Sequence, residues 1–159
     1  MPGMDRRSLL LTLPLAACGD MLHGNLGQFH ATTLHGERFD NTLLRGRPLL
    51  VQLWTTWCGY CRGEQAVVDE LEREFGAGGV VILAVNVGET RRTVTNYLQD
   101  SPRRVRIVLE TETNLVTLLG RHGVPYYAMV RVDGRIAGEL RGAHGATALR
   151  QLVERGMSG

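Results

Sequence analysis

Apolar and polar positions along the chain fall into blocks that predict an order of strands and helices. Residues 49–54 and 80–87 are almost continuously apolar, which is typical of strands covered on both faces of a parallel sheet. Between them, residues 58–75 repeat apolar side chains every three or four positions, which predicts a helix ended by the glycines that follow. Further elements are predicted as helices over 91–99, 113–119 and 146–155, and as strands over 106–109, 126–132 and 135–140.

The predicted order is βαβαβ, followed by a β-hairpin and a last helix. This order predicts an α/β fold in which a mixed central sheet carries helices on both of its faces. Ahead of it, residues 29–33 and 37–39 flank His35-Gly36 and predict a small N-terminal β-hairpin extension. The 159 residues are enough for one domain with a substantial core, which we place at residues 28–156, followed by a short tail over 157–159.

Two cysteines stand where the strand over 49–54 gives way to the following helix. Cys58 is expected at the helix N-terminus and Cys61 one turn further on. Unpaired backbone N–H groups and the helix dipole favour negative charge at that position, so the Cys58 thiol should ionise more easily than a free cysteine. Because the thiolate is the form that attacks disulfides, the spacing predicts a redox-active Cys58–Cys61 pair that needs no other cofactor.

Two other uses of the Cys-x-x-Cys spacing are less well supported. A zinc site needs about four ligands, whereas the chain has one further cysteine, Cys18, and His122 and His144 would complete a site only by coincidence. A purely structural disulfide across so short a loop removes little entropy from the unfolded chain. We therefore expect no metal site.

The first residues have the layout of a secretory signal. Residues 1–17 combine a positively charged start with a short apolar core, too short to span a bilayer permanently. The sequence Leu-Ala-Ala-Cys that ends at Cys18 resembles the lipobox of bacterial lipoproteins, which implies cleavage before Cys18 and lipidation of that residue. The alternative is a plain secretory signal in which Cys18 is incidental. Residues 18–27 would then be a tether.

Charge and composition exclude one class of partner. The net charge is only +2, and all 18 basic residues are arginine, so no nucleic-acid-binding footprint is present. The basic cluster of Arg103, Arg104 and Arg106 is expected to be a solvated surface, with a contact to an acidic partner as the alternative.

Two motifs resemble a known family. Trp57-Cys58-Gly59-Tyr60-Cys61 after an apolar strand, together with the later Val124-Pro125, resembles the thioredoxin fold over residues 28–156. Within that fold the chain is most similar to the membrane-anchored, extracytoplasmic ResA- and TlpA-like reductases. Three features carry this similarity: Glu64 three residues after Cys61, the run Ala84-Val85-Asn86-Val87-Gly88-Glu89, and the N-terminal export and anchoring segment.

The resemblance implies roles for the residues around the cysteine pair. Cys58 would be the exposed nucleophile, Cys61 the buried resolving thiol, and Glu64 the acidic residue beside Cys61. The sequence itself supports this role for Glu64. A position three residues after Cys61 lies on the same helix face, and a carboxylate there can accept the Cys61 proton. Many thioredoxins carry a buried aspartate at the position that Gln52 occupies here. Because a glutamine cannot titrate, the proton acceptor has to come from elsewhere, and Glu64 is the best candidate. The alternative for Glu64 is an ordinary exposed helix carboxylate.

The resemblance also implies where a partner protein binds. Pro125 would be a cis-proline facing the disulfide, and the backbone of Val124 would pair with an extended substrate segment. Trp57 would contact the partner or simply pack, and Gly59 and Tyr60 would lie in the same contact region. Glu89 would be a carboxylate near this cavity, or else a surface loop charge.

These features predict a monomeric, lipid-anchored thiol–disulfide oxidoreductase that acts outside the cytoplasm. The resemblance implies a protein disulfide as substrate, in cytochrome c maturation or copper-site assembly, and a membrane thiol–disulfide protein as electron donor. One departure matters, because Tyr60 stands where these reductases usually have proline. The Gly59-Tyr60 pair is found in periplasmic disulfide isomerases, so an isomerase or oxidase is one alternative. A non-catalytic copper chaperone is another.

Overall fold

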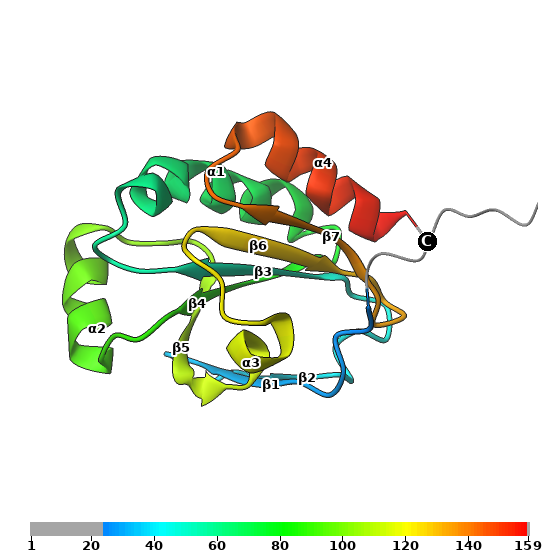
Figure 1. Cartoon of the computed structure of the whole chain (residues 1–159), viewed down its shortest axis with the longest axis horizontal. Helices are drawn as coiled ribbons and strands as arrows, with labels where there is room; N and C mark the ends of the chain where they lie inside the picture. Colours follow the sequence, from blue (N-terminus) through cyan, green and yellow to red (C-terminus); the bar gives the residue numbers. More distant parts are fainter. Residues whose placement is uncertain (1–23, 159) are drawn as a thin grey trace, which may run out of the picture.

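A mixed sheet with helices on both faces is built from the residues that the computed structural model describes, 24–158 (Figure 1). Its strands are β1 (His30–Thr33), β2 (Arg38–Asp40), β3 (Leu49–Trp54), β4 (Val81–Asn86), β5 (Arg106–Thr113), β6 (Tyr126–Val130) and β7 (Ile136–Arg141). Its helices are α1 (Gly59–Phe75), α2 (Arg91–Asp100), α3 (Leu115–Leu119) and α4 (Gly145–Met157). The strand order is β2-β1-β5-β4-β3-β6-β7, with β3, β4 and β5 parallel and the outer pairings antiparallel.

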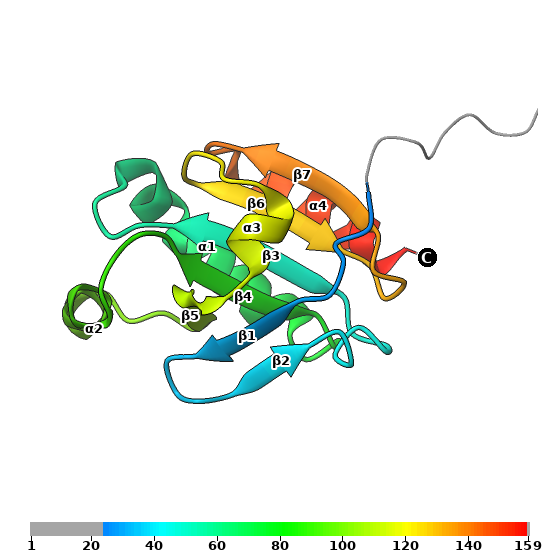
Figure 2. The same cartoon turned by 60° about the horizontal axis from the view of Figure 1, so that its bottom comes forward.

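Alternating side chains of the central strand separate two apolar cores. Leu50 and Trp54 of β3 face the core that α1, α2 and α4 cover, and this core also contains both cysteines. Leu49 and Val51 face the opposite core, which α3 covers together with the segment before β1. Figure 2 shows α3 on one side of the sheet and α1 and α4 on the other. The predicted class and two-faced architecture are confirmed.

The N-terminal hairpin changes the end of β5. β1 and β2 pair antiparallel around Gly36, as predicted, and Gly36 has a positive φ of 85°. β1 also pairs with β5, bringing Ala31 opposite Thr113. β5 is therefore longer than the predicted strand over 106–109, and α3 begins only at Leu115. The amphipathic pattern at 113–119 gave no sign of this pairing, because the partner strand lies about 80 residues away.

Part of the segment assigned to a tether belongs to the folded domain. The N–H of Ile136 donates to the Gly24 carbonyl (3.0 Å), and the N–H of Leu26 donates to the Gly134 carbonyl (2.9 Å). The side chain of Leu26 is buried. The predicted signal segment 1–17 and the lipidation site Cys18 lie outside the described residues. Across residues 24–158, no helix has the length and apolar character needed to cross a membrane.

Candidate active site

The end of β3 and the start of α1 position the two cysteines. Cys58 is the N-cap of α1, with extended backbone angles (φ −77°, ψ 109°), and its carbonyl accepts the N–H of Arg62 (3.1 Å). The Cys58 sulfur accepts the backbone N–H of Cys61 (3.1 Å), a donor that the helix itself leaves unpaired. Cys58 and Cys61 form a disulfide, with their Cα atoms 5.2 Å apart. The predicted pairing is therefore present, and Cys58 occupies the predicted place at the helix N-terminus.

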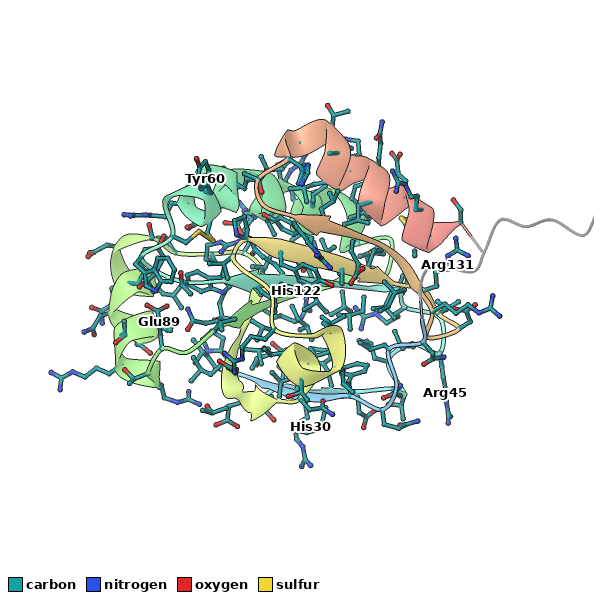
Figure 3. All side chains as sticks on the ribbon, in the orientation of Figure 1. His30, Arg45, Tyr60, Glu89, His122 and Arg131 are labelled. Carbon is teal, nitrogen blue, oxygen red and sulfur yellow. A yellow bond between two sulfur atoms is a disulfide. The ribbon has the colours of Figure 1, made fainter. Side chains whose placement is uncertain are left out.

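The disulfide is covered, and exposed aromatic side chains flank it. Cys58 is 5% exposed and Cys61 is 3% exposed, so the expected contrast between an exposed and a buried sulfur is not seen in this oxidised state. Trp57 and Tyr60 are 69% and 75% exposed. The exposure of Trp57 contradicts the alternative in which its ring simply packs. Gly59 is also exposed, and Figure 3 shows Tyr60 and the disulfide at the same end of the molecule.

The cis-proline lies on the strand next to the one that leads to Cys58. The Val124–Pro125 peptide bond is cis, as predicted. Leu53 of β3 pairs with Tyr126 of β6, so the residues before Tyr126 run alongside the segment after Leu53. Val124 is half-buried and packs against the apolar cluster that contains both cysteines. The structure thus brings Val124 and Pro125 to the cysteine pair from a position more than sixty residues away in the sequence.

Glu64 is buried and is fully engaged with its surroundings. One carboxylate oxygen accepts the backbone N–H groups of His144 (2.7 Å) and Gly145 (2.6 Å), at the start of α4. The other accepts the hydroxyl of Tyr127 (2.6 Å). The His144 side chain does not cap α4, so Glu64 of α1 supplies this cap instead. The alternative of an ordinary exposed helix carboxylate is wrong, and Glu64 has a structural task that the sequence did not indicate.

Polar contacts continue from Tyr127 to a buried arginine. The amide nitrogen of Gln52 lies 3.3 Å from the Tyr127 hydroxyl, and Arg103 donates to the Gln52 amide oxygen (3.3 Å). Arg103 also forms an ion pair with Asp69 (3.1 Å), and its guanidinium lies 5.7 Å from the centre of the Trp54 ring. Burial first, and then the hydrogen bond to Glu64, raise the pKa of Tyr127, so its hydroxyl stays protonated at any working pH.

The prediction that Arg103, Arg104 and Arg106 form a solvated surface is wrong for two of the three. The Arg103 side chain is only 2% exposed because Asp69 and Gln52 pair with it inside the fold. Arg106 pairs with Glu72 (3.0 Å) and Glu37 (3.4 Å). Arg104 is exposed. A run of arginines does not reveal which of its members pairs with a carboxylate inside the fold, because Asp69 and Glu72 lie on α1, more than thirty residues earlier in the chain.

Glu89 braces the turn that leads into the cysteine pair. Its carboxylate accepts the backbone N–H (2.8 Å) and the hydroxyl (2.6 Å) of Thr56, and an amide N–H of Asn86 (2.7 Å). Partial burial raises the pKa of Glu89, but the hydrogen bonds from Thr56 and Asn86 outweigh it and hold the pKa below its usual range. Glu89 lies at the same end of the molecule as Tyr60 (Figure 3). Its placement supports a role in holding the turn, and contact with a substrate stays a prediction.

Replacing Glu89 by glutamine is expected to lower the free energy of unfolding by about 1 kcal/mol at neutral pH, after allowance for solvent screening. Since the folded pKa is depressed, the stabilisation is present above the ordinary carboxyl value and is lost as the pH falls through the folded one. Urea unfolding near pH 7 and near pH 3 should therefore show a difference that shrinks in acid. Glu112→Gln, which removes a surface ion pair of 3.7 Å, is the control. An undiminished difference at low pH would contradict this role.

The two histidines considered as metal ligands lie in connecting segments. His122 precedes β6, stacks on Tyr126 with ring centres 4.2 Å apart, and contacts the Leu119 carbonyl. His144 contacts the Arg141 carbonyl through its ring. Within residues 24–158, no three His, Cys, Asp or Glu side chains gather in a way that could hold a metal ion.

Together the sheet order, the disulfide at the start of α1 and the adjacent cis-proline define a thioredoxin-fold protein with a redox-active dithiol. The model of the Redoxin family matches residues 21–150, so the chain belongs to that family. It is 26% identical over 161 aligned residues to the thiol-disulfide oxidoreductase ResA of Geobacillus thermodenitrificans, covering 93% of this chain and 92% of that protein. The chain is a thiol–disulfide oxidoreductase of the ResA and DsbE type.

Other comparisons agree with this assignment. The thiol:disulfide interchange protein DsbE of Vibrio cholerae is 28% identical over 125 residues, covering 76% of this chain and 66% of that protein. Among solved structures, a thiol:disulfide interchange protein of the thioredoxin family from Chlorobium tepidum superposes with a TM-score of 0.75 at 20% identity, covering 87% of this chain and 99% of that chain. At that identity the superposition supports the fold alone.

Proposed function

We propose that this oxidoreductase works outside the cytoplasm as a membrane-anchored reductase of disulfides in partner proteins, in cytochrome c maturation or copper-site assembly. The observation that carries the proposal is the arrangement around the disulfide. Two exposed aromatic side chains, Trp57 and Tyr60, flank the cysteines, and the backbone at Val124 lies beside them. Such a surface suits an extended protein segment better than a small molecule. The resemblance to ResA- and TlpA-like proteins supports reduction rather than oxidation.

The reaction uses the two sulfurs in turn. The Cys58 thiolate attacks one sulfur of the partner disulfide, a Cys58–partner bond forms, and the other partner sulfur leaves as a thiolate. Cys61 then attacks the Cys58 sulfur, which releases the second partner sulfur and forms the disulfide seen here. Two electrons have passed to the partner, and its two thiolates take up two protons. A dithiol protein in the membrane would restore the Cys58–Cys61 dithiol.

The position of Gly24 supports an anchored arrangement. The Gly24 carbonyl accepts a hydrogen bond from Ile136 at the start of β7. This is the end of the molecule where Arg45 and Arg131 lie, opposite the disulfide (Figures 1 and 3). Cys18 precedes Gly24 by six residues, a span of at most about 20 Å. A lipid on Cys18 would therefore hold this end towards the membrane and leave Trp57 and Tyr60 facing away from it.

Two measurements test the location of the protein and the direction of electron transfer. In cells, the wild-type protein is expected in the membrane fraction and Cys18→Ser in the soluble extracytoplasmic fraction; membrane retention of Cys18→Ser would contradict the anchor.

With purified protein, the reduction potential of the Cys58–Cys61 pair is measured against glutathione and against dithiothreitol. A potential well below the glutathione range is expected for a reductase, whereas one within or above that range would favour the isomerase or oxidase that Gly59-Tyr60 suggests.

The copper chaperone has its own distinguishing result. Thiolates are soft ligands that suit Cu(I), so the reduced pair could bind it. Tight copper binding by protein that fails to reduce insulin disulfides would favour the chaperone. Reduction of insulin that continues in the presence of a copper chelator would favour the reductase.

A further inference from the structure

A chain of hydrogen bonds links the buried Arg103 cation to the buried carboxylate of Glu64, which lies on α1 three residues after Cys61. It runs from Arg103 to Gln52 (3.3 Å), from Gln52 to the Tyr127 hydroxyl (3.3 Å), and from that hydroxyl to Glu64 (2.6 Å). Gln52 and Tyr127 lie opposite each other in the β3–β6 pairing, and their side chains are fully buried. No bulk solvent therefore competes for these groups.

The chemistry of the end groups fixes the direction of the chain. A guanidinium only donates, so Gln52 must turn its carbonyl oxygen to Arg103 and its NH₂ group to Tyr127. The Tyr127 oxygen accepts that N–H, which leaves its one hydrogen for Glu64. A carboxylate cannot donate in return, so every hydrogen bond in the chain points the same way. The orientation of the Gln52 amide follows from Arg103 and is not a free choice.

We propose that Tyr127 is a positioning residue for the resolving step, in which Cys61 attacks the mixed disulfide. Gln52 and Arg103 orient the Tyr127 hydroxyl so that it donates its hydrogen to Glu64. This inference rests on the proposed function and concerns the second half of its reaction. Glu64 lies three residues after Cys61 on α1, and both side chains are buried on the same side of the helix. Tyr127 donates to one oxygen and the start of α4 to the other, so the carboxylate is held in a fixed orientation on the helix face that it shares with Cys61.

The step that this arrangement serves is the attack of Cys61 on the mixed disulfide. The Cys61 S–H bond breaks and its proton passes to the Glu64 carboxylate. The Cys61–Cys58 bond forms as the Cys58–partner bond breaks, and the electron pair of that bond leaves on the partner sulfur, which then takes up a proton. The partner is reduced and the Cys58–Cys61 pair is oxidised, so atoms and electrons balance.

Several other charged or titratable groups lie near Glu64. Their contributions to a pH profile have to be distinguished from that of Glu64. Cys61 shares its helix, Tyr127 faces it from β6, and the Arg103–Asp69 ion pair lies at the far end of the chain. His144 contacts it only through the backbone N–H, but its imidazole ring is a further ionisable group on the same residue. The measurements are therefore repeated in a His144→Asn background, which keeps that N–H and removes the ring.

The test is Tyr127→Phe, with Tyr126→Phe as the matched control. Both tyrosines are fully buried and each donates to a carboxylate, but Tyr126 donates to Glu139 and packs in the opposite core. The readout is the decay of the mixed disulfide between Cys58 and glutathione, followed over pH by release of glutathione. Tyr127→Phe removes one of the hydrogen bonds that the Glu64 carboxylate accepts, so the acid limb of its rate profile should move to higher pH than in the wild type. Tyr126→Phe should leave the profile in place, and both variants should form the mixed disulfide at the wild-type rate.

Gln52→Glu gives a second route to the same answer if Tyr127→Phe does not fold. This variant keeps the length of the side chain at position 52 and leaves Tyr127 in place, but it offers the Tyr127 hydroxyl a second carboxylate. The pH profile of mixed-disulfide decay should therefore move in the same direction as in Tyr127→Phe. Profiles of Tyr127→Phe or Gln52→Glu that coincide with those of the wild type and Tyr126→Phe would overturn the inference. Failure of the wild-type dithiol to attack glutathione disulfide or insulin would instead overturn the proposed function, and the two failures are therefore distinguishable.

Discussion

Cys58→Ala is expected to reduce insulin disulfides no faster than the uncatalysed background. The reason is that Cys58 alone combines the helix N-cap position with a place between the exposed Trp57 and Tyr60. Cys61→Ala should still attack but cannot resolve, so it should accumulate a covalent Cys58–insulin species that reducing agent releases. The measurement is insulin turbidity together with non-reducing electrophoresis.

The third cysteine of the chain provides the control for this pair. Cys18→Ala is expected to reduce insulin at the wild-type rate in detergent solution, since that residue precedes the folded domain. If Cys58→Ala kept even a tenth of the wild-type rate, or if Cys61→Ala trapped nothing, the order of attack assigned to the two sulfurs would be contradicted.

Changes at Glu64 are expected to separate its two tasks. Glu64→Ala removes the acceptor of the buried Tyr127 hydroxyl and of the part-buried backbone N–H groups of His144 and Gly145, which should lower the free energy of unfolding by about 2–4 kcal/mol. Glu64→Gln keeps an oxygen that can cap α4 and should lower it by only about 1 kcal/mol. Both variants lack the proton acceptor, so resolution of the mixed disulfide should slow by roughly ten- to a hundredfold in each.

Urea unfolding and stopped-flow decay of the mixed disulfide measure these two effects independently. A Glu64→Gln variant that resolves at the wild-type rate would remove Glu64 from the chemistry and leave it as a helix cap. A Glu64→Ala variant as stable as the wild type would show that other groups satisfy the start of α4.

Much of the architecture could be predicted from the sequence because local patterns specify it. The continuously apolar runs became β3 and β4, the amphipathic stretch after Cys58 became α1, and the β-hairpin predicted over 126–140 became β6 and β7. The predictions were less accurate where distant segments meet. β5 was extended by its pairing with β1, and residues 24–27 were drawn onto the β6–β7 hairpin rather than left as a tether.

The candidate site shows the same division. The cysteine pair and the cis-proline carry their own sequence signals, and both were predicted. Tyr127 and Arg103 were missed, since a tyrosine in an apolar strand and an arginine in a basic run give no sign of their partners. Glu64 and Gln52 contact these residues through the tertiary packing of α1 and the sheet, which no local pattern in the sequence specifies. The presence of a glutamine where an aspartate is common was the one available signal that a polar side chain at this position takes part in the buried contacts.

The proposed mechanism depends most on the electrostatics at the start of α1, and the ionisation of Cys58 tests it most directly. In reduced Cys61→Ala protein, thiolate absorbance at about 240 nm followed over pH should show Cys58 half-ionised well below pH 8.5, the approximate value for a free cysteine, because the helix dipole and the backbone N–H at position 61, which the substitution keeps, stabilise its anion. Ionisation at or above that pH would contradict the mechanism.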